Sequence, residues 1–92
     1  MIFFRRAYSY FQLSKYHEAK KDYIHCINNN YNKPESFFNL SLINLTLGKD
    51  SLAKNDIDSA LKIIPNDNKF LNQRKRVLMP KNERMIHDIS SL

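Results

Sequence analysis

The sequence predicts an all-α fold in which helix–turn–helix units stack into a right-handed solenoid. Residue classes recur at a spacing of 34, apolar residues within each unit lie at helical spacing, and the single glycine and the three prolines stand at expected turns. Ala19 recurs as Ala53, and Tyr23 recurs as Ile57. Small residues at such positions let helices approach closely, while larger apolar residues fill the groove of the next helix. A period of this length is typical of stacked helical repeats.

The first unit is expected to contain two helices. One covers about residues 1–13, and its apolar side chains form one stripe: Ile2, Phe3, Ala7, Tyr10, Phe11 and Leu13. Ser14 and Lys15 form the turn, and the second helix runs from about Tyr16 to Asn28. The asparagine run and Lys33-Pro34 end it, because proline disfavours helix in the residue before it.

The second unit repeats this pattern with clearer boundaries. Its first helix is expected to start near Pro34, which suits a first-turn proline, and to stop at Gly48. Asp50 or Ser51 is expected to cap the next helix, which Pro65 closes.

A fifth helix is expected from Lys69 to about Leu78, after a turn and cap at residues 66–68. We predict a repeat domain over residues 1–80, with repeat one at 1–33, repeat two at 34–67 and a capping helix at 68–79. Pro80 interrupts the helix, and the short extension 80–92 is expected to form a last helix over residues 81–92. A final helix with a polar outer face covers the last apolar surface of such arrays.

Composition narrows the function. The net charge is +6, and no run of about 18 apolar residues exists, so no membrane span is expected. A single cysteine and the lack of a secretory signal favour the cytoplasm. His17, His25 and His87 lack ligand spacing, and no base–nucleophile pair or phosphate loop occurs. We therefore expect no enzymatic activity, no metal and no cofactor, and Cys26 is expected to be buried packing.

These columns resemble the tetratricopeptide repeat over about residues 1–80. The second unit carries the most specific matches, at Leu40, Gly48, Ala53, Ile57, Ala60 and Pro65. Ser14, Cys26 and Tyr31 depart from the pattern in the first unit, where glycine, alanine and proline are usual. The resemblance implies a protein-interaction module in which the first helix of each pair lines a concave groove.

Steps of 34 residues along these first helices give the expected groove. Its columns include Arg5, Asn39, Gln73 and also Met1, Glu35, Lys69. The predicted peptide-binding residues form an apolar strip with polar groups at its ends, and they are Phe4, Arg5, Tyr8, Phe38, Asn39, Leu42, Lys69 and Arg76. The expected ligand is a peptide or helix of a partner protein.

A narrower resemblance suggests a chaperone adaptor as an alternative. The stretches Phe3-Phe4-Arg5-Arg6-Ala7 and Glu18-Ala19-Lys20 are similar to the last repeat of co-chaperones such as the large immunophilins. That resemblance implies a clamp for the Glu-Glu-Val-Asp tail of a heat-shock chaperone, with the chain as the C-terminal part of a longer clamp domain in a protein similar to the large immunophilins. Arg5, Asn39 and Lys69 would supply part of the clamp, whereas Met1, Glu35 and Gln73 depart from it.

Two further alternatives concern the ends of the chain. The basic segment 69–84 includes Arg74-Lys75-Arg76 and is compatible with a polyanion or calmodulin. Pro80 interrupts it, and the aromatics stand in packing columns, so nucleic acid is disfavoured. At the other end, Phe3, Phe4 and Phe11 lie near an uncapped helix start, so self-association through the N-terminal edge is expected.

Overall fold

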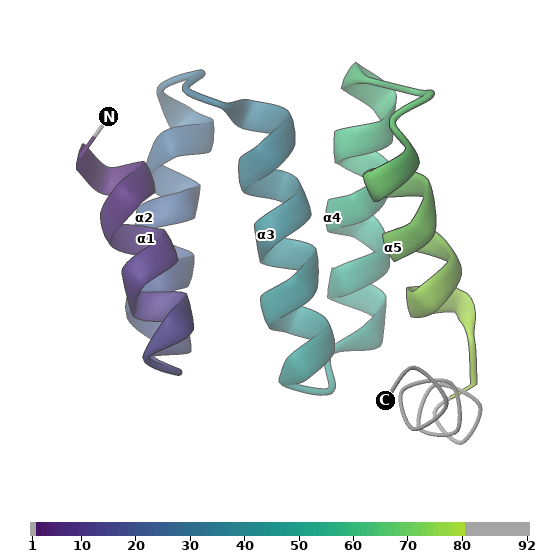
Figure 1. The fold of residues 1–92 in the computed structure, drawn as a ribbon, viewed down its shortest axis with the longest axis horizontal. Helices are drawn as coiled ribbons and strands as arrows, with labels where there is room; N and C mark the ends of the chain where they lie inside the picture. Colours follow the sequence, from purple (N-terminus) through teal and green to yellow (C-terminus); the bar gives the residue numbers. More distant parts are fainter. Residues whose placement is uncertain (1, 81–92) are drawn as a thin grey trace.

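The computed structural model describes residues 2–80, and helices make up most of this span. The five helices are α1 (Ile2–Gln12), α2 (Tyr16–Asn28), α3 (Lys33–Thr46), α4 (Asp50–Ile63) and α5 (Asn68–Leu78). Figure 1 shows α1 in front of α2 and α5 in front of α4, with α3 between the two pairs. No strand occurs among residues 2–80. The predicted all-α solenoid is confirmed.

The turns inside the two units have the same geometry. Gly48 has a φ of 76°, and Ser14, which stands one period earlier, has a φ of 61°. The N–H of Lys49 donates to the carbonyl of Asn44 at 2.8 Å, and the N–H of Lys15 donates to that of Tyr10 at 2.8 Å. This bond pattern with a left-handed residue ends a helix tightly. Ser14 therefore adopts the left-handed conformation for which glycine is better suited.

The asparagine run forms a third turn of this kind. Asn30 and Asn32 have φ values of 54° and 42°. The N–H of Tyr31 donates to the carbonyl of Cys26 at 2.9 Å. Asparagine enters the left-handed region more easily than most residues because its short polar side chain bonds locally. Pro34 then lies in the first turn of α3, as predicted.

The predicted cap of α4 is wrong, whereas that of α5 is confirmed. Helix α4 begins at Asp50, and its N-cap is Lys49, whose side chain forms no cap bond. The preceding turn leads directly into the helix, so the carbonyl of Lys49 already accepts from Ala53 at 2.9 Å. At α5 the carboxylate of Asp67 accepts from the N–H of Phe70 at 3.1 Å. Asp50 instead lies in the first turn, where the helix dipole favours a negative charge.

Two apolar clusters form the core. The first joins α1, α2 and α3 and contains Ala7, Ala19, Tyr23, Leu40 and Ile43; the second joins α4 and α5 and contains Ile57, Ala60 and Phe70. Cys26 is fully buried, which confirms its predicted packing role. No helix among residues 2–80 is long and apolar enough to cross a membrane.

A chain of polar contacts seats α5 on the preceding pair. Nε2 of Gln73 donates to Oγ of Ser41 at 3.2 Å, and this hydroxyl donates to the carbonyl of Ala53 at 2.8 Å. Gln73 and Ser41 are both buried, so the bonds are shielded from water. Met1 and residues 81–92, including the expected last helix and His87, lie outside the described residues. The predicted division into repeats, capping helix and extension stays a prediction.

Candidate peptide-binding groove

Two hollows lie along the side of the stack formed by α1, α3 and α5. The larger is about 570 Å³, and it is lined by Phe38, Leu42, Lys69, Asn72, Gln73, Lys75, Arg76 and Met79. The smaller is about 430 Å³, and it is lined by Tyr8, Phe11, Gln12, Ser14, Tyr16, Asn39 and Leu42. Leu42 lines both, so the hollows meet on α3. Together we call them the concave groove.

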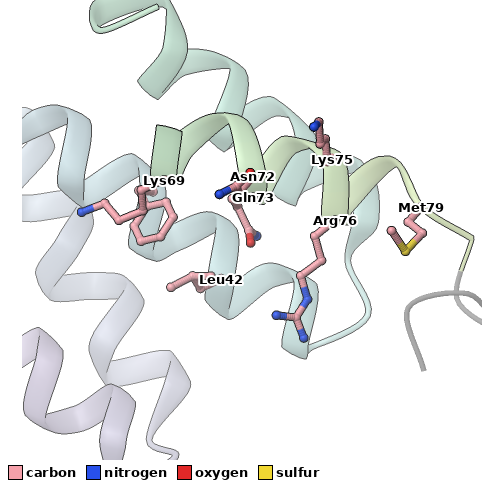
Figure 2. Close-up of a pocket in the computed structure, with 8 residues that line it drawn as sticks. Leu42, Lys69, Asn72, Gln73, Lys75, Arg76 and Met79 are labelled. Atoms are coloured by element: carbon pink, nitrogen blue, oxygen red, sulfur yellow. The ribbon is translucent and has the colours of Figure 1, made fainter. Parts of the chain in front are cut away.

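Figure 2 shows how side chains of α5 stand around the larger hollow. Arg76 and Leu42 lie on the sides of α5 and α3 that face each other, whereas Lys75 points away from Leu42. Met79 follows at the C-terminal end of α5. Apolar side chains therefore form the floor near α3, and cationic groups stand on the α5 side.

Lys69 makes close contacts at the other end of this hollow. Its Nζ lies 2.8 and 2.9 Å from the two carboxylate oxygens of Glu35. The same ammonium lies 5.0 Å from the ring centroid of Phe38 and 5.6 Å from that of Phe70. The two rings pack with centroids 5.4 Å apart. Lys69 thus links α3 to α5, and its charge is balanced by Glu35.

A family model for the tetratricopeptide repeat matches residues 2–33 and 34–67. The chain belongs to the tetratricopeptide repeat family. The predicted family is thereby confirmed, and the tetratricopeptide repeats indicate a protein–protein interaction module. Folds of this family are generally non-enzymatic. No curated protein and no solved structure matches the chain.

The structure of this tetratricopeptide repeat chain brings six predicted site residues to the concave groove. They are Tyr8, Phe38, Asn39, Leu42, Lys69 and Arg76. Phe4 and Arg5 line neither hollow. The ring of Phe4 packs edge-on against Tyr23 and Tyr31, with centroids 5.7 and 6.0 Å away, and Arg5 is exposed on α1. The binding role of all eight residues stays a prediction.

Sequence reasoning missed several lining residues. Gln12, Ser14 and Tyr16 belong to the end of α1, the turn and the start of α2, whereas the predicted columns run only through the first helix of each unit. The turn follows every first helix at the same phase, so an extension of the columns through it would have included these residues. The sequence pattern places Lys75 only in the basic segment.

One titratable group, Tyr23, is buried in the first core cluster. Burial raises the pKa of Tyr23 far above its usual range, with smaller effects from Tyr8, Cys26 and Glu35. Its hydroxyl has no hydrogen-bond partner among residues 2–80. In the part of the chain that the structure describes, no three His, Cys, Asp or Glu side chains group to hold a metal ion.

The predicted self-association surface is partly covered by the chain itself. The ring centroid of Phe3 lies 4.1 Å from that of His25, and that of Phe11 lies 6.0 Å from that of Tyr16. Each contact joins α1 to α2 and reduces the apolar area left at the N-terminal edge. Self-association stays a prediction, as does binding of the basic segment, part of which lies outside residues 2–80.

Proposed function

We propose that this chain binds an extended or helical segment of a partner protein along the concave groove. The meeting of two hollows at Leu42 carries the proposal, because it gives a continuous surface across α1, α3 and α5. Each hollow has a volume within the range of about 300–1,000 Å³ that is usual for ligand sites. Phe38 and Leu42 provide apolar contact, and Asn39 offers an amide beside it.

The charge distribution selects the kind of segment. Lys75 and Arg76 stand on the α5 side of the larger hollow, and its lining among residues 2–80 contains no carboxylate. An acidic residue of the partner near α5 and an apolar residue over Leu42 would fit this arrangement. The partner segment is therefore proposed to combine an apolar anchor with an acidic residue toward α5.

The chaperone adaptor is the alternative function. It would use Lys69 as a clamp lysine, but Glu35 already contacts this ammonium through both carboxylate oxygens. Gln73, at another clamp position, is turned inward to Ser41. A carboxylate-ended ligand would have to displace Glu35, so we favour an internal segment over a chain terminus.

A displayed library of random twelve-residue peptides, selected on the purified chain, tests the main proposal. We expect the selected peptides to lose roughly tenfold in affinity for the Leu42→Ser variant, because about 1.4 kcal/mol corresponds to tenfold. Ile63→Ser is the matched control, since Ile63 is exposed on α4 and lines neither hollow. Equal affinity for both variants would contradict the proposal.

Calorimetric titration separates the alternative. A peptide ending in Met-Glu-Glu-Val-Asp is titrated beside the same peptide with an amidated C-terminus. Micromolar binding that disappears on amidation would favour the chaperone adaptor. Binding that survives amidation, or none, would remove the need for a free carboxylate and leave the internal-segment proposal standing.

A further inference from the structure

A third hollow opens between α2 and α4, the helices that stand behind α1 and α5 in Figure 1. It has a volume of about 360 Å³, and its lining is Lys20, Ile24, Ile27, Phe37, Leu40, Asn44, Leu52 and Asp56. None of these residues lines the concave groove. We call it the convex hollow, and it goes beyond the proposed function because it is a separate surface.

Repeat one shows what fills the equivalent place there. The guanidinium of Arg6 donates to both carboxylate oxygens of Asp22, at 2.7 and 2.8 Å. It also lies 5.1 Å from the ring centroid of Phe3 and 5.7 Å from that of Tyr10. Asp22 is only 5% exposed, and this buried charge is balanced by Arg6 of the same chain.

The 34-residue period transfers this arrangement to repeat two. Asp22 corresponds to Asp56, and Arg6 corresponds to Leu40. The two ring positions, Phe3 and Tyr10, become Phe37 and Asn44. All four positions of repeat two line the convex hollow. Repeat two thus keeps the carboxylate and one ring but lacks the guanidinium.

Asp56 consequently has no arginine partner among residues 2–80. Asn44 donates from Nδ2 to its Oδ2 at 2.7 Å, and no ion pair of Asp56 occurs among residues 2–80. Burial raises the pKa of Asp56, although the bond from Asn44 and the charge of Lys20 oppose that shift. The site therefore holds a partly desolvated negative charge that an incoming cation would stabilise.

Asn44 adds a second unsatisfied acceptor. A carboxylate only accepts, so the bond to Asp56 requires that the amide nitrogen of Asn44 face it. Oδ1 of Asn44 is then directed elsewhere and has no partner within the described chain, although Asn44 is only 4% exposed. The floor of the hollow thus presents two kinds of acceptor and no donor that satisfies Oδ1.

We infer that the convex hollow binds the guanidinium group of an arginine side chain that a partner protein presents, with Asp56 as its ion-pair partner and Phe37 beneath it. Arginine suits the site better than lysine because its planar fork pairs with carboxylates and stacks on rings. Ile24 and Leu52, 45% and 48% exposed, flank the opening. The partner's arginine therefore stands between apolar residues.

Lys20 lines the same hollow and is the native competitor. It lowers the pKa of Asp56 through its charge, yet it forms no ion pair with it. Lysine is a strongly hydrated point charge that favours water over a half-buried site. Removal of this charge is expected to strengthen binding of the arginine.

NMR titration of the ¹⁵N-labelled chain tests the inference. The probes are acetyl-Leu-Arg-Leu-amide and two analogues in which lysine or citrulline, an uncharged isostere, replaces arginine. We expect saturable shifts of the Asn44 side-chain amide with the arginine peptide, at least roughly threefold weaker binding of the lysine peptide, and no saturation with citrulline.

Matched variants make the test specific. Asp56→Asn should weaken the arginine peptide roughly tenfold or more, and Lys20→Gln should strengthen it. Asp58→Asn is the control, because it removes the same charge from the same helix, where Asp58 pairs with Lys54 and Arg74. The spectra also report whether each variant is folded. Equal losses in the two aspartate variants, shifts that bypass Asn44, or no saturation in the native chain would each overturn the inference.

Discussion

The left-handed turn residue of repeat one is expected to limit stability. Ser14 adopts a φ of 61° in the turn where repeat two has Gly48 at 76°. A residue with a Cβ pays about 1–2 kcal/mol in this region, while glycine loses about 0.4–1 kcal/mol through its freer unfolded chain. The difference predicts that Ser14→Gly stabilises the fold by about 0.5–1 kcal/mol. For a domain of this size, that raises Tm by about 2–8 °C.

The reverse change provides the matched control. A Cβ at Gly48 would meet no atom within 4 Å, so Gly48→Ser tests backbone conformation without a clash. It should lower stability by about 0.5–1 kcal/mol. Thermal and urea unfolding, followed by circular dichroism at 222 nm, measure both variants. A Ser14→Gly variant no more stable than the native chain would refute the reasoning, whatever Gly48→Ser does.

Three other changes test contacts between helices. Asp56→Asn should raise Tm at pH 7, because burial raises the pKa of the carboxyl and the folded chain therefore bears a cost while it is charged. The native chain binds more protons when folded than when unfolded, so the Tm difference between the variant and the native chain should shrink as pH falls below the raised pKa of Asp56. The difference should vanish below about 3.8, the ordinary pKa, and a higher Tm of the variant that persists there would contradict this. Ser41→Ala should lower the free energy of unfolding by about 1–2 kcal/mol, measured in urea, because Gln73 loses its buried acceptor. Glu35→Gln should change stability by less than about 1 kcal/mol, since the pair with Lys69 is half-exposed, yet it should tighten calorimetric binding of acidic peptides; unchanged affinity would show that Lys69 takes no part.

The helices and their order were predictable because one period repeats the same packing requirement. Ala19 and Ala53 are both fully buried, and so are Tyr23 and Ile57. The cap of α4 was not predictable by residue type alone. Asp50 is a good cap residue, but the turn geometry at Gly48 had already placed it inside the helix.

The groove was predictable where both repeats use a column in the same way. Phe38 faces the larger hollow because its ring packs on Phe70 of the next unit. Its counterpart in repeat one is Phe4, and the residue that corresponds to Phe70 is Ser36, so Phe4 has no aromatic ring at that position to pack against. Phe4 packs on Tyr23 instead. A 34-residue column thus predicts which way a side chain points only when the residues that pack against it are also the same type in both repeats.

The convex hollow follows from a mismatch between the repeats that was readable in the sequence. Asp22 and Asp56 share a column, and Arg6 and Leu40 share another, so Asp56 has a leucine where Asp22 has its arginine. The groove columns do not include these positions. The meaning of this mismatch also required the structure, because a lone aspartate on a helix is ordinarily solvated. The hollow around Asp56 gives an arginine of a partner protein room to reach this carboxylate, and this supports the binding hypothesis.

The two proposed surfaces meet on a single helix, and this connects the two proposals. Leu42 and Asn44 are two residues apart on α3, and they line hollows on different sides of the stack. Neither hollow shares a lining residue with the other, so an occupant of one leaves the contacts of the other in place. The losses of binding free energy caused by changes at Leu42 and at Asp56 are then expected to add, because each change affects a different occupant. With both proposals in place, the chain would hold two partner segments at once and join them.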